Sequence, residues 1–315
     1  MITVVNPAFL SVIVDNGRFG YGYIGVAPSS GLDRFAMAMA RFALGMPDNA
    51  PVFEIMGDDL SLLFSETVTF AITGARVKAT VDDVPVEPWC AVKAPKGSIL
   101  KVAEVLEGFR YYIGFSGIID IDAVMGSYST NLECGFGGFQ GRPLMKGDIL
   151  KFREIYDPIE HVGIPDLLIP SMCGPHILRV LSGPEADRFD PASVEFLSNR
   201  NEAAFFKASP RLNRTGIRLD GPAIQFRDKV DQSIISEGIL PGTIQVPPDG
   251  LPIINCVERT IGGYARLGTV INVDLYKLAH IKPFDRVILS VSDRDEAERL
   301  SRARKDSIAF YVKKQ

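Results

Sequence analysis

Short apolar runs bounded by turn-forming residues recur along most of the chain. Runs of about four to eight residues between Gly, Pro, Asn or Asp are typical of the strands of an all-β barrel or sandwich. We expect strands at residues 10–14, 68–72, 76–81, 99–105, 111–115 and 177–181. The pattern therefore predicts a mainly β protein with a few short helices.

A short turn sequence occurs three times directly before an apolar run. It spans residues 96–100, 146–150 and 283–287. Each copy places turn-forming residues where a tight turn would enter a strand. The repetition indicates related barrels in the two halves of the chain.

Four prolines between Tyr156 and Pro175 indicate a connection between these halves. The segment has little hydrophobic periodicity, which is typical of a linker. We predict a first β-barrel-containing half at residues 1–157, a proline-rich connection at 158–176 and a second half at 177–315.

Helical signals are few. Asp33 is a suitable N-cap for a helix over residues 34–44. A short helix is expected at residues 274–281, with Asp274 as its cap, and a charged, solvent-exposed helix at residues 293–304.

The composition is that of an ordinary globular protein, with 46% apolar and 23% charged residues. The formal net charge of −4 argues against a nucleic-acid binder, which normally has a basic surface. No apolar run is long enough for a membrane span, and the four cysteines, without a C-x-x-C pair, are typical of a reducing compartment. We expect a cytoplasmic protein. The three histidines lack metal-ligand spacing, so no metal site is expected.

Residues 20–25 match the dinucleotide-binding pattern G-x-G-x-x-G by their letters. That pattern requires a helix that begins inside it, whereas the expected helix starts only at Arg34. We interpret the segment as a glycine-rich turn. The chain has no Walker phosphate loop, and Ser116 lacks a complete G-x-S-x-G motif. Lys146 is interpreted as a turn lysine and not as a biotin attachment site.

A first glycine-rich stretch combines small hydroxyl side chains with a cation. It runs from Gly126 to Thr130 and continues from Gly135 to Arg142. Small hydroxyls beside glycines let hydrogen-bond donors approach an anion or a carbonyl group closely, so this stretch is a candidate binding loop. A bulge-rich structural loop explains the same residues equally well.

A second stretch, in the C-terminal half, is richer in charged groups. Arg214 and Arg218 are of the residue type that holds a carboxylate or phosphate in bidentate fashion. Glu258 fits two roles equally well, a proton acceptor or the ion-pair partner of either arginine. Asp249 lies in a Pro-Asp-Gly turn and is either functional or purely structural.

Taken in chain order, these stretches resemble the allophanate hydrolase subunit 2 family, also called the biotin-dependent carboxyltransferase subdomain family. This family includes the C component of ATP-dependent 5-oxoprolinase, which the chain resembles most. The resemblance covers nearly the whole chain. The motifs that carry it are Asp15 to Gly20, Ser30 to Asp33, Glu54, Gly126 to Thr130, Asn213 to Leu219, Ser236 to Gly238, Gln245 to Gly250 and Thr260 to Tyr264.

The sequence departs from the family's pattern at several positions. Val14 replaces a glutamine, Arg41 an asparagine and Phe284 a glycine. The run from Glu258 to Tyr264 is shorter than in the family, and this difference bears on the presumed site.

The resemblance implies cyclophilin-like β-barrels in two subdomains, the second of which carries the Gln245–Gly250 and Gly262–Tyr264 loops. It implies the C component of an ATP-dependent 5-oxoprolinase-type complex, which hydrolyses 5-oxo-L-proline to L-glutamate and is active only together with its partners. The implied partners are the A component and the B component of the same complex, the latter allophanate hydrolase subunit 1-like. ATP is expected to be shared with a partner, because the chain has no phosphate loop.

The residues and the resemblance together define a candidate site. Predicted catalytic residues, which would steady anionic charge or handle a proton, are Arg214, Arg218, Asp249 and Glu258. Predicted substrate-binding residues are Ser127, Ser129, Thr130, Asn213, Gln245, Gly262, Gly263 and Tyr264. Supporting roles are predicted for Arg18, Asp33, Glu54 and Arg142.

Two other functions fit the same resemblance. One is a carboxyltransferase component acting on urea or a related amide, with biotin carried by a partner. The other is a non-catalytic regulatory partner of a kinase inhibitor that is itself similar to the B component.

Overall fold

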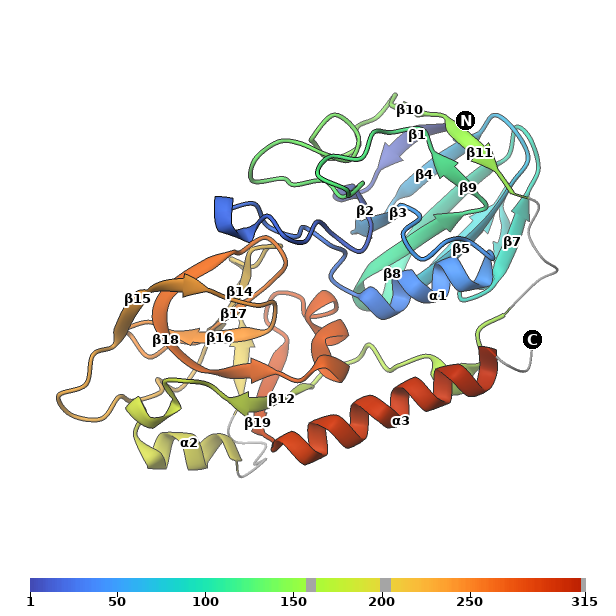
Figure 1. The fold of residues 1–315 in the computed structure, drawn as a ribbon. Helices are drawn as coiled ribbons and strands as arrows, with labels where there is room; N and C mark the ends of the chain where they lie inside the picture. The colour runs from blue at the N-terminus through green and yellow to red at the C-terminus, as the bar shows by residue number, and fades with distance from the viewer. Residues whose placement is uncertain (157–162, 199–204, 313–315) are drawn as a thin grey trace. The chain divides into compact units, whose positions relative to one another are not determined.

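The computed structural model describes residues 1–156, 163–198 and 205–312, and these form two compact units (Figure 1). The first unit contains Met1–Gly20 and Pro28–Met172, and the second contains Tyr21–Ala27 and Cys173–Gln315.

The domain limits expected from the sequence, 1–157 and 177–315, stay a prediction. Residues 158–162 of the predicted proline-rich connection lie outside the described residues.

The first unit is built on a nine-stranded sheet whose main path has the order β10-β1-β4-β8-β3-β2. Strand β5 pairs with β8 and also with β6 and β7. Strands β9 and β11 form a separate antiparallel pair. The strands are β1 (Ile2–Pro7), β2 (Leu10–Val14), β3 (Val52–Met56), β4 (Leu60–Phe64), β5 (Val68–Val81), β6 (Val84–Val86), β7 (Ala91–Ala94), β8 (Ile99–Phe115), β9 (Gly117–Ile119), β10 (Ile149–Leu150) and β11 (Phe152–Ile155).

Strands β5 and β8 are each longer than the sequence pattern predicted. The expected strands at 68–72 and 76–81 are one strand, and so are those at 99–105 and 111–115. The two strands pair with register shifts on either side of Arg76, so the interruptions in the apolar pattern are β-bulges and not turns. Gly74 is required at the bulge: its φ is +86°, and a Cβ there would lie 2.8 Å from the Arg110 carbonyl oxygen.

Helix α1 (Arg34–Ala43) packs on β5 and β8. It begins as predicted, because the Asp33 carboxylate accepts a hydrogen bond from the Ala36 N–H at 2.8 Å. Its buried face includes Ala36, Met37 and Ala40, while the core of the unit comes from the inward side chains of the strands. A short 3-10 helix, η2 (Asp166–Leu168), lies near the end of the unit.

The second unit is a closed barrel of seven strands. The order β12-β19-β13-β14-β17-β16-β18 returns to its start because β12 also pairs with β18, and β15 is attached to β18 outside the ring. The strands are β12 (His176–Ser182), β13 (Phe206–Ala208), β14 (Gly216–Asp220), β15 (Ser233–Gly238), β16 (Thr243–Val246), β17 (Ile253–Asn255), β18 (Ile261–Val270) and β19 (Arg286–Val291). The helices are η1 (Gly22–Ile24), η3 (Ala186–Arg188), α2 (Pro191–Ser198), η4 (Asn272–Ala279) and α3 (Arg294–Val312).

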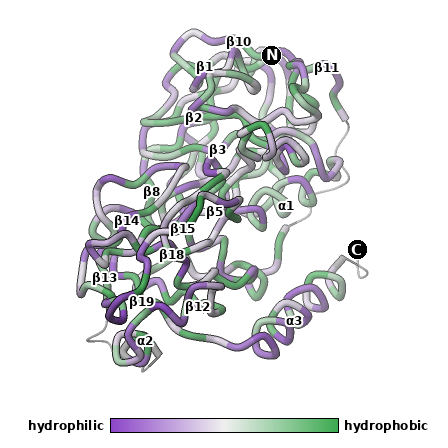
Figure 2. The backbone as a smooth tube through the Cα atoms, turned by 60° about the vertical axis from the view of Figure 1, so that its left-hand side comes forward, coloured by the Kyte–Doolittle hydropathy of each residue, from purple (hydrophilic) through white to green (hydrophobic). Residues whose placement is uncertain are grey.

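Two predicted helices of this unit differ from expectation. Asp274 lies inside the 3-10 helix η4 instead of capping it, because its buried carboxylate pairs with Arg179 at 2.8 Å. Helix α3 is longer than the predicted 293–304 and is mostly hydrophilic along its length (Figure 2). Its first turn is capped by Asp293, whose carboxylate accepts the Glu296 N–H at 2.7 Å.

The mainly β fold class is confirmed, with a closed barrel in one unit and a half-barrel sheet in the other. Among the described residues, no helix combines the length and the apolar character that a membrane span needs.

Phe284, which replaces a glycine of the family's pattern, occupies a left-handed backbone conformation with φ +71°. Its side chain is 69% exposed, so removing it sacrifices little packing. Left-handed φ costs a non-glycine residue about 1–2 kcal/mol, partly offset by the extra freedom of glycine in the unfolded chain, so Phe284→Gly should stabilise the protein by about 0.5–1 kcal/mol. Urea unfolding measures this change. Phe284→Ala keeps the strained φ and should give no such gain; an equal gain from alanine would contradict the explanation.

Candidate functional site

The predicted site residues are distributed over both units. The first unit holds Arg18, Asp33, Glu54, Ser127, Ser129, Thr130 and Arg142. The second holds Asn213, Arg214, Arg218, Gln245, Asp249, Glu258, Gly262, Gly263 and Tyr264.

A buried carboxylate, Asp15, organises the first group. Its Oδ1 accepts hydrogen bonds from the hydroxyls of Ser127, at 2.6 Å, and Ser129, at 2.7 Å. The backbone N–H groups of Gly17, at 2.8 Å, and Tyr128, at 2.6 Å, also donate to the carboxylate. Asp15 is only 3% exposed, and these donors replace the water that it loses on folding. The loop after β2 and the glycine-rich stretch are thereby tied together.

Thr130 and Arg18 strengthen the same connection. The Thr130 hydroxyl donates to the Ile13 carbonyl at 2.9 Å, and the Arg18 Nη2 donates to the Ser129 carbonyl. The Arg18 guanidinium also lies 4.8 Å from the centre of the Phe136 ring, within cation–π range. The three hydroxyls of this stretch are fully buried and used inside the unit, so their predicted role in substrate binding stays a prediction.

Glu54 and Asp33 belong to a second buried network, beneath the start of α1. The Glu54 Oε2 accepts hydrogen bonds from the Tyr112 hydroxyl and the Leu32 N–H, both at 2.8 Å. The Tyr112 oxygen in turn accepts the Asp33 N–H at 2.8 Å. Burial, and next the charge of Glu54, hold the pKa of Tyr112 well above its usual value, so the phenol stays a donor. Both predicted supporting residues therefore fix the loop that leads into α1.

Both terminal nitrogens of Arg142 donate hydrogen bonds to the Asp148 carboxylate. The Nη1–Oδ2 distance is 2.7 Å and the Nη2–Oδ1 distance is 2.9 Å, so the pair is bidentate. Hydrogen bonding to the arginine lowers the pKa of Asp148, whose carboxylate also accepts the Met145 N–H. Arg142 thus closes the turn before β10, and Lys146 in that turn is exposed.

In the second unit, Arg214 and Glu258 form a buried ion pair. The Arg214 Nε lies 2.8 Å from the Glu258 Oε1, with side-chain exposures of 3% and 4%. The Glu258 N–H donates to the Arg214 carbonyl at 3.1 Å, which brings the start of β14 against the end of β17. The structure therefore realises the ion-pair alternative for these two residues; proton transfer by Glu258 stays a prediction.

Gln245 belongs to a row of buried polar groups on β16, β17 and β18. The Asn255 amide donates to the Gln245 Oε1 at 3.2 Å and to the Thr243 carbonyl at 3.0 Å. The Gln245 Nε2 donates to the Tyr264 carbonyl at 3.3 Å. A Cβ on Gly262 would lie 2.1 Å from that nitrogen, so Gly262 makes room for the glutamine.

The four predicted catalytic residues do not form one group. Strands β16 and β17 are antiparallel and joined through residues 247–252, so Asp249 lies at the end of β17 opposite to Glu258. Arg218 pairs with Ile253 at the Asp249 end and is exposed, as Asp249 is. The Asp249 Oδ1 accepts the Leu251 N–H at 3.0 Å, which supports its structural role in the turn.

A polar hollow of about 270 Å³ lies beside this turn, and the sequence analysis missed most of it. Residues 224–230, Gln232 and residues 248–250 line it. Asp249 is its one predicted site residue. The run Gln225, Arg227, Asp228, Lys229 and Gln232 carried a signal in the sequence, since charged and amide side chains are dense there without helical or strand periodicity.

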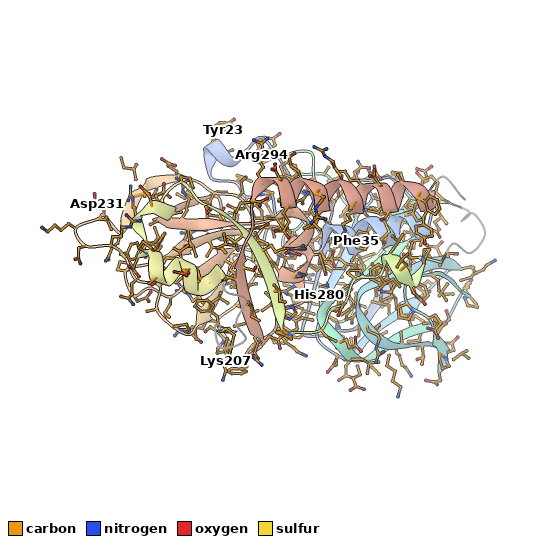
Figure 3. The ribbon with its side chains drawn as sticks, turned by 90° about the horizontal axis from the view of Figure 1, so that it is seen from below. Tyr23, Phe35, Lys207, Asp231, His280 and Arg294 are labelled. Atoms are coloured by element: carbon orange, nitrogen blue, oxygen red, sulfur yellow. The ribbon has the colours of Figure 1, made fainter. Side chains whose placement is uncertain are left out.

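The sequence predicted neither a nucleotide-phosphate loop at residues 20–25 nor a metal centre. Residues 22–24 form only the 3-10 helix η1, and Tyr23 is 85% exposed (Figure 3). Without a helix that begins inside the glycine pattern, these residues do not fit a nucleotide phosphate. No cluster of three or more His, Cys, Asp or Glu side chains within the described ranges is placed to hold a metal ion.

A family model of the carboxyltransferase domain, subdomains A and B, matches residues 24–290. The chain belongs to this family. The finding confirms the resemblance inferred from the motifs. The chain is 34% identical to the 5-oxoprolinase C component of Escherichia coli over 289 residues, covering 89% of this chain and 88% of that protein. It is also 30% identical to urea amidolyase of Saccharomyces cerevisiae, covering 86% of this chain but 15% of that protein.

Solved structures of longer proteins contain the same fold. The urea amidolyase of Kluyveromyces lactis aligns with a TM-score of 0.89 and 26% identity over 98% of this chain. The urea carboxylase of that organism gives the same TM-score and identity. The chain spans 20% of the amidolyase structure and 29% of the carboxylase structure.

Because Asp15 anchors this network, we predict that removing its charge lowers the stability of the protein strongly. Asp15→Asn keeps the shape but replaces an acceptor oxygen by a donor, which should lower the free energy of unfolding by about 2–4 kcal/mol. Urea unfolding measures the loss. The control is Asp122→Asn, in the same unit, where the side chain is fully exposed and stability should not change. Equal stability of the two variants would contradict the network's role.

The Arg214–Glu258 pair is tested by a double-mutant cycle. Arg214→Met or Glu258→Gln alone removes one charge of this buried pair and should cost about 3–5 kcal/mol. The double variant should cost less than the sum of the two, with a coupling energy of about 1–3 kcal/mol. Additive losses in urea unfolding would show that the pair does not hold the two strand ends together.

Proposed function

We propose that the chain is the C component of an ATP-dependent 5-oxoprolinase-type complex that hydrolyses 5-oxo-L-proline to L-glutamate. The observation that carries this proposal is the extent of the match to a 5-oxoprolinase C component: 34% identity over 88% of that relative's length. The match to urea amidolyase covers only 15% of its length. Because the relative is named as one subunit of an enzyme, the proposal includes the A and B components as partners.

Exposure separates the predicted catalytic residues by role. Arg218 and Asp249 are exposed and lie at the same end of the barrel, so we assign contact with substrate to them. Arg214 and Glu258 are buried against each other, so we assign them the positioning of the two strand ends. Asp249 would orient water or accept a proton, and Arg218 would steady the developing negative charge.

Hydrolysis of the lactam requires activation of its amide carbon, which Arg218 and Asp249 do not provide. An amide carbon is a poor electrophile, and ATP, when bound, supplies the activation that makes it open to attack by water. Since the described residues include no phosphate-binding loop, we place ATP on a partner protein or shared with one.

A second candidate is a carboxyltransferase component acting on urea. The TM-score of 0.89 to urea amidolyase over 98% of the chain favours it. Under this alternative, biotin on a partner protein would carry the carboxyl group.

The test is turnover by the chain co-expressed with its A and B partners. We expect ADP and glutamate to form only when 5-oxo-L-proline is added. Asp249→Asn should lower kcat about 100-fold or more, as loss of a general base does. The matched control is Asp220→Asn, an exposed carboxylate at the end of β14, which should keep full activity.

Two outcomes would contradict the proposal. One is an assembled wild-type complex that leaves 5-oxo-L-proline intact. The other is carboxylation of urea by the chain with a biotinylated carrier, which would establish the second candidate. Full turnover by Asp249→Asn would overturn the site assignment alone.

A further inference from the structure

We propose that the polar hollow beside the Pro247–Gly250 turn binds a small carboxylate that also carries an N–H group, with Arg227 and Lys229 as the cationic residues that hold the carboxylate. This inference rests on the proposed function, because 5-oxo-L-proline and L-glutamate both have this chemistry. It adds residues that neither the motifs nor the resemblance pointed to.

The charges that line the hollow are not neutralised by one another. Arg227, Asp228, Lys229 and Asp249 all line it, yet no ion pair within the described residues joins any two of them. Arg227 donates its Nε to the Phe189 carbonyl at 3.1 Å, and its two terminal nitrogens have no acceptor among the described residues. A guanidinium held at one nitrogen presents its remaining donors in a fixed direction, as carboxylate recognition requires.

The walls of the hollow are fixed before any ligand binds. The Ile224 N–H donates to the Gly250 carbonyl at 2.9 Å, which joins the two walls. A Cβ on Gly250 would lie 2.8 Å from the Ile224 carbonyl oxygen, so the turn approaches this closely only with glycine. The Arg227 N–H donates to the Arg188 carbonyl at 2.9 Å, and the centres of the Phe189 and Phe226 rings lie 4.8 Å apart. A preformed site loses less entropy on binding.

Like Phe284, Lys229 has a left-handed backbone conformation. Its φ is +60°, a left-handed conformation that is unfavourable for a residue with a side chain. Such strain tends to occur at binding sites, where it sets the direction of a side chain.

The lining also indicates the class of ligand. Two cations suit one carboxylate, while the carboxylates of Asp228 and Asp249 and the Gln232 amide suit an N–H donor. A volume of about 270 Å³ is below the usual range for drug-sized ligands, so the molecule is small. The surface that the lining residues expose to the hollow is mostly polar, which disfavours an apolar body. Urea fits the N–H part but lacks the carboxylate.

The test compares ligands that differ by one group on the full chain. Calorimetry should show saturable binding of 5-oxo-L-proline, with 2-pyrrolidinone, the same lactam without its carboxylate, at least about tenfold weaker. Arg227→Gln with Lys229→Gln should weaken 5-oxo-L-proline about tenfold or more and leave 2-pyrrolidinone unchanged. The control is Lys207→Gln, an exposed lysine on β13 that lies well apart from Asp231 of the hollow's loop (Figure 3).

The outcomes separate this proposal from the proposed function. The site would be overturned if the wild-type chain bound the two lactams equally or showed no saturable binding. It would also be overturned if inorganic phosphate competed as well as 5-oxo-L-proline, or if the double variant bound 5-oxo-L-proline as tightly as the wild type. A second measurement uses the assembled complex, in which the double variant should have a higher KM for 5-oxo-L-proline with little change in kcat. Turnover with an unchanged KM rejects the hollow but keeps the proposed function, whereas ligand binding without any turnover keeps the hollow and rejects that function.

Discussion

A carboxylate that leaves water on folding must find enough donors inside the protein, and this requirement shapes the loops of both units. Asp15 gathers two serine hydroxyls and two backbone amides, and so joins segments that are more than a hundred residues apart in the chain. Glu54 does the same for the loop before α1, and Glu258 for two strand ends of the barrel. Most polar residues of the family motifs therefore hold the backbone in place, and the chemistry depends on what these anchored loops leave exposed.

That division explains why polar residues alone are a poor guide to a site. Ser127, Ser129 and Thr130 have the side chains of a binding loop, but their hydroxyls are already used by Asp15 and by a carbonyl group. A residue can bind substrate only with donors or acceptors that folding has not used. Arg218 and Asp249 meet this condition because they are exposed on the barrel.

The sequence predicted correctly those structural features that are decided by residues close together in the chain. Strand β2, the mainly β class and the Asp33 cap of α1 follow from short apolar runs between turn residues and from local hydrogen bonding. It failed where distant partners decide the result. The bulges of β5 exist because β8 pairs on both sides of them, and Asp274 is inside η4 because Arg179 lies across from it. The partner of Glu258 was left open for the same reason, since nothing local distinguishes Arg214 from Arg218.

The position of the hollow follows from the order of the strands. β14 ends beside the turn that joins β16 and β17, because the Leu219 N–H donates to the Pro252 carbonyl. The next strand in the chain, β15, instead pairs with β18, and it begins at Ser233 opposite Tyr264. Residues 221–232 must therefore pass three strands of the barrel at the end where Asp249 lies. A connection that crosses beside a turn encloses a space, and charged residues on both walls make that space a binding site without any change to the barrel itself.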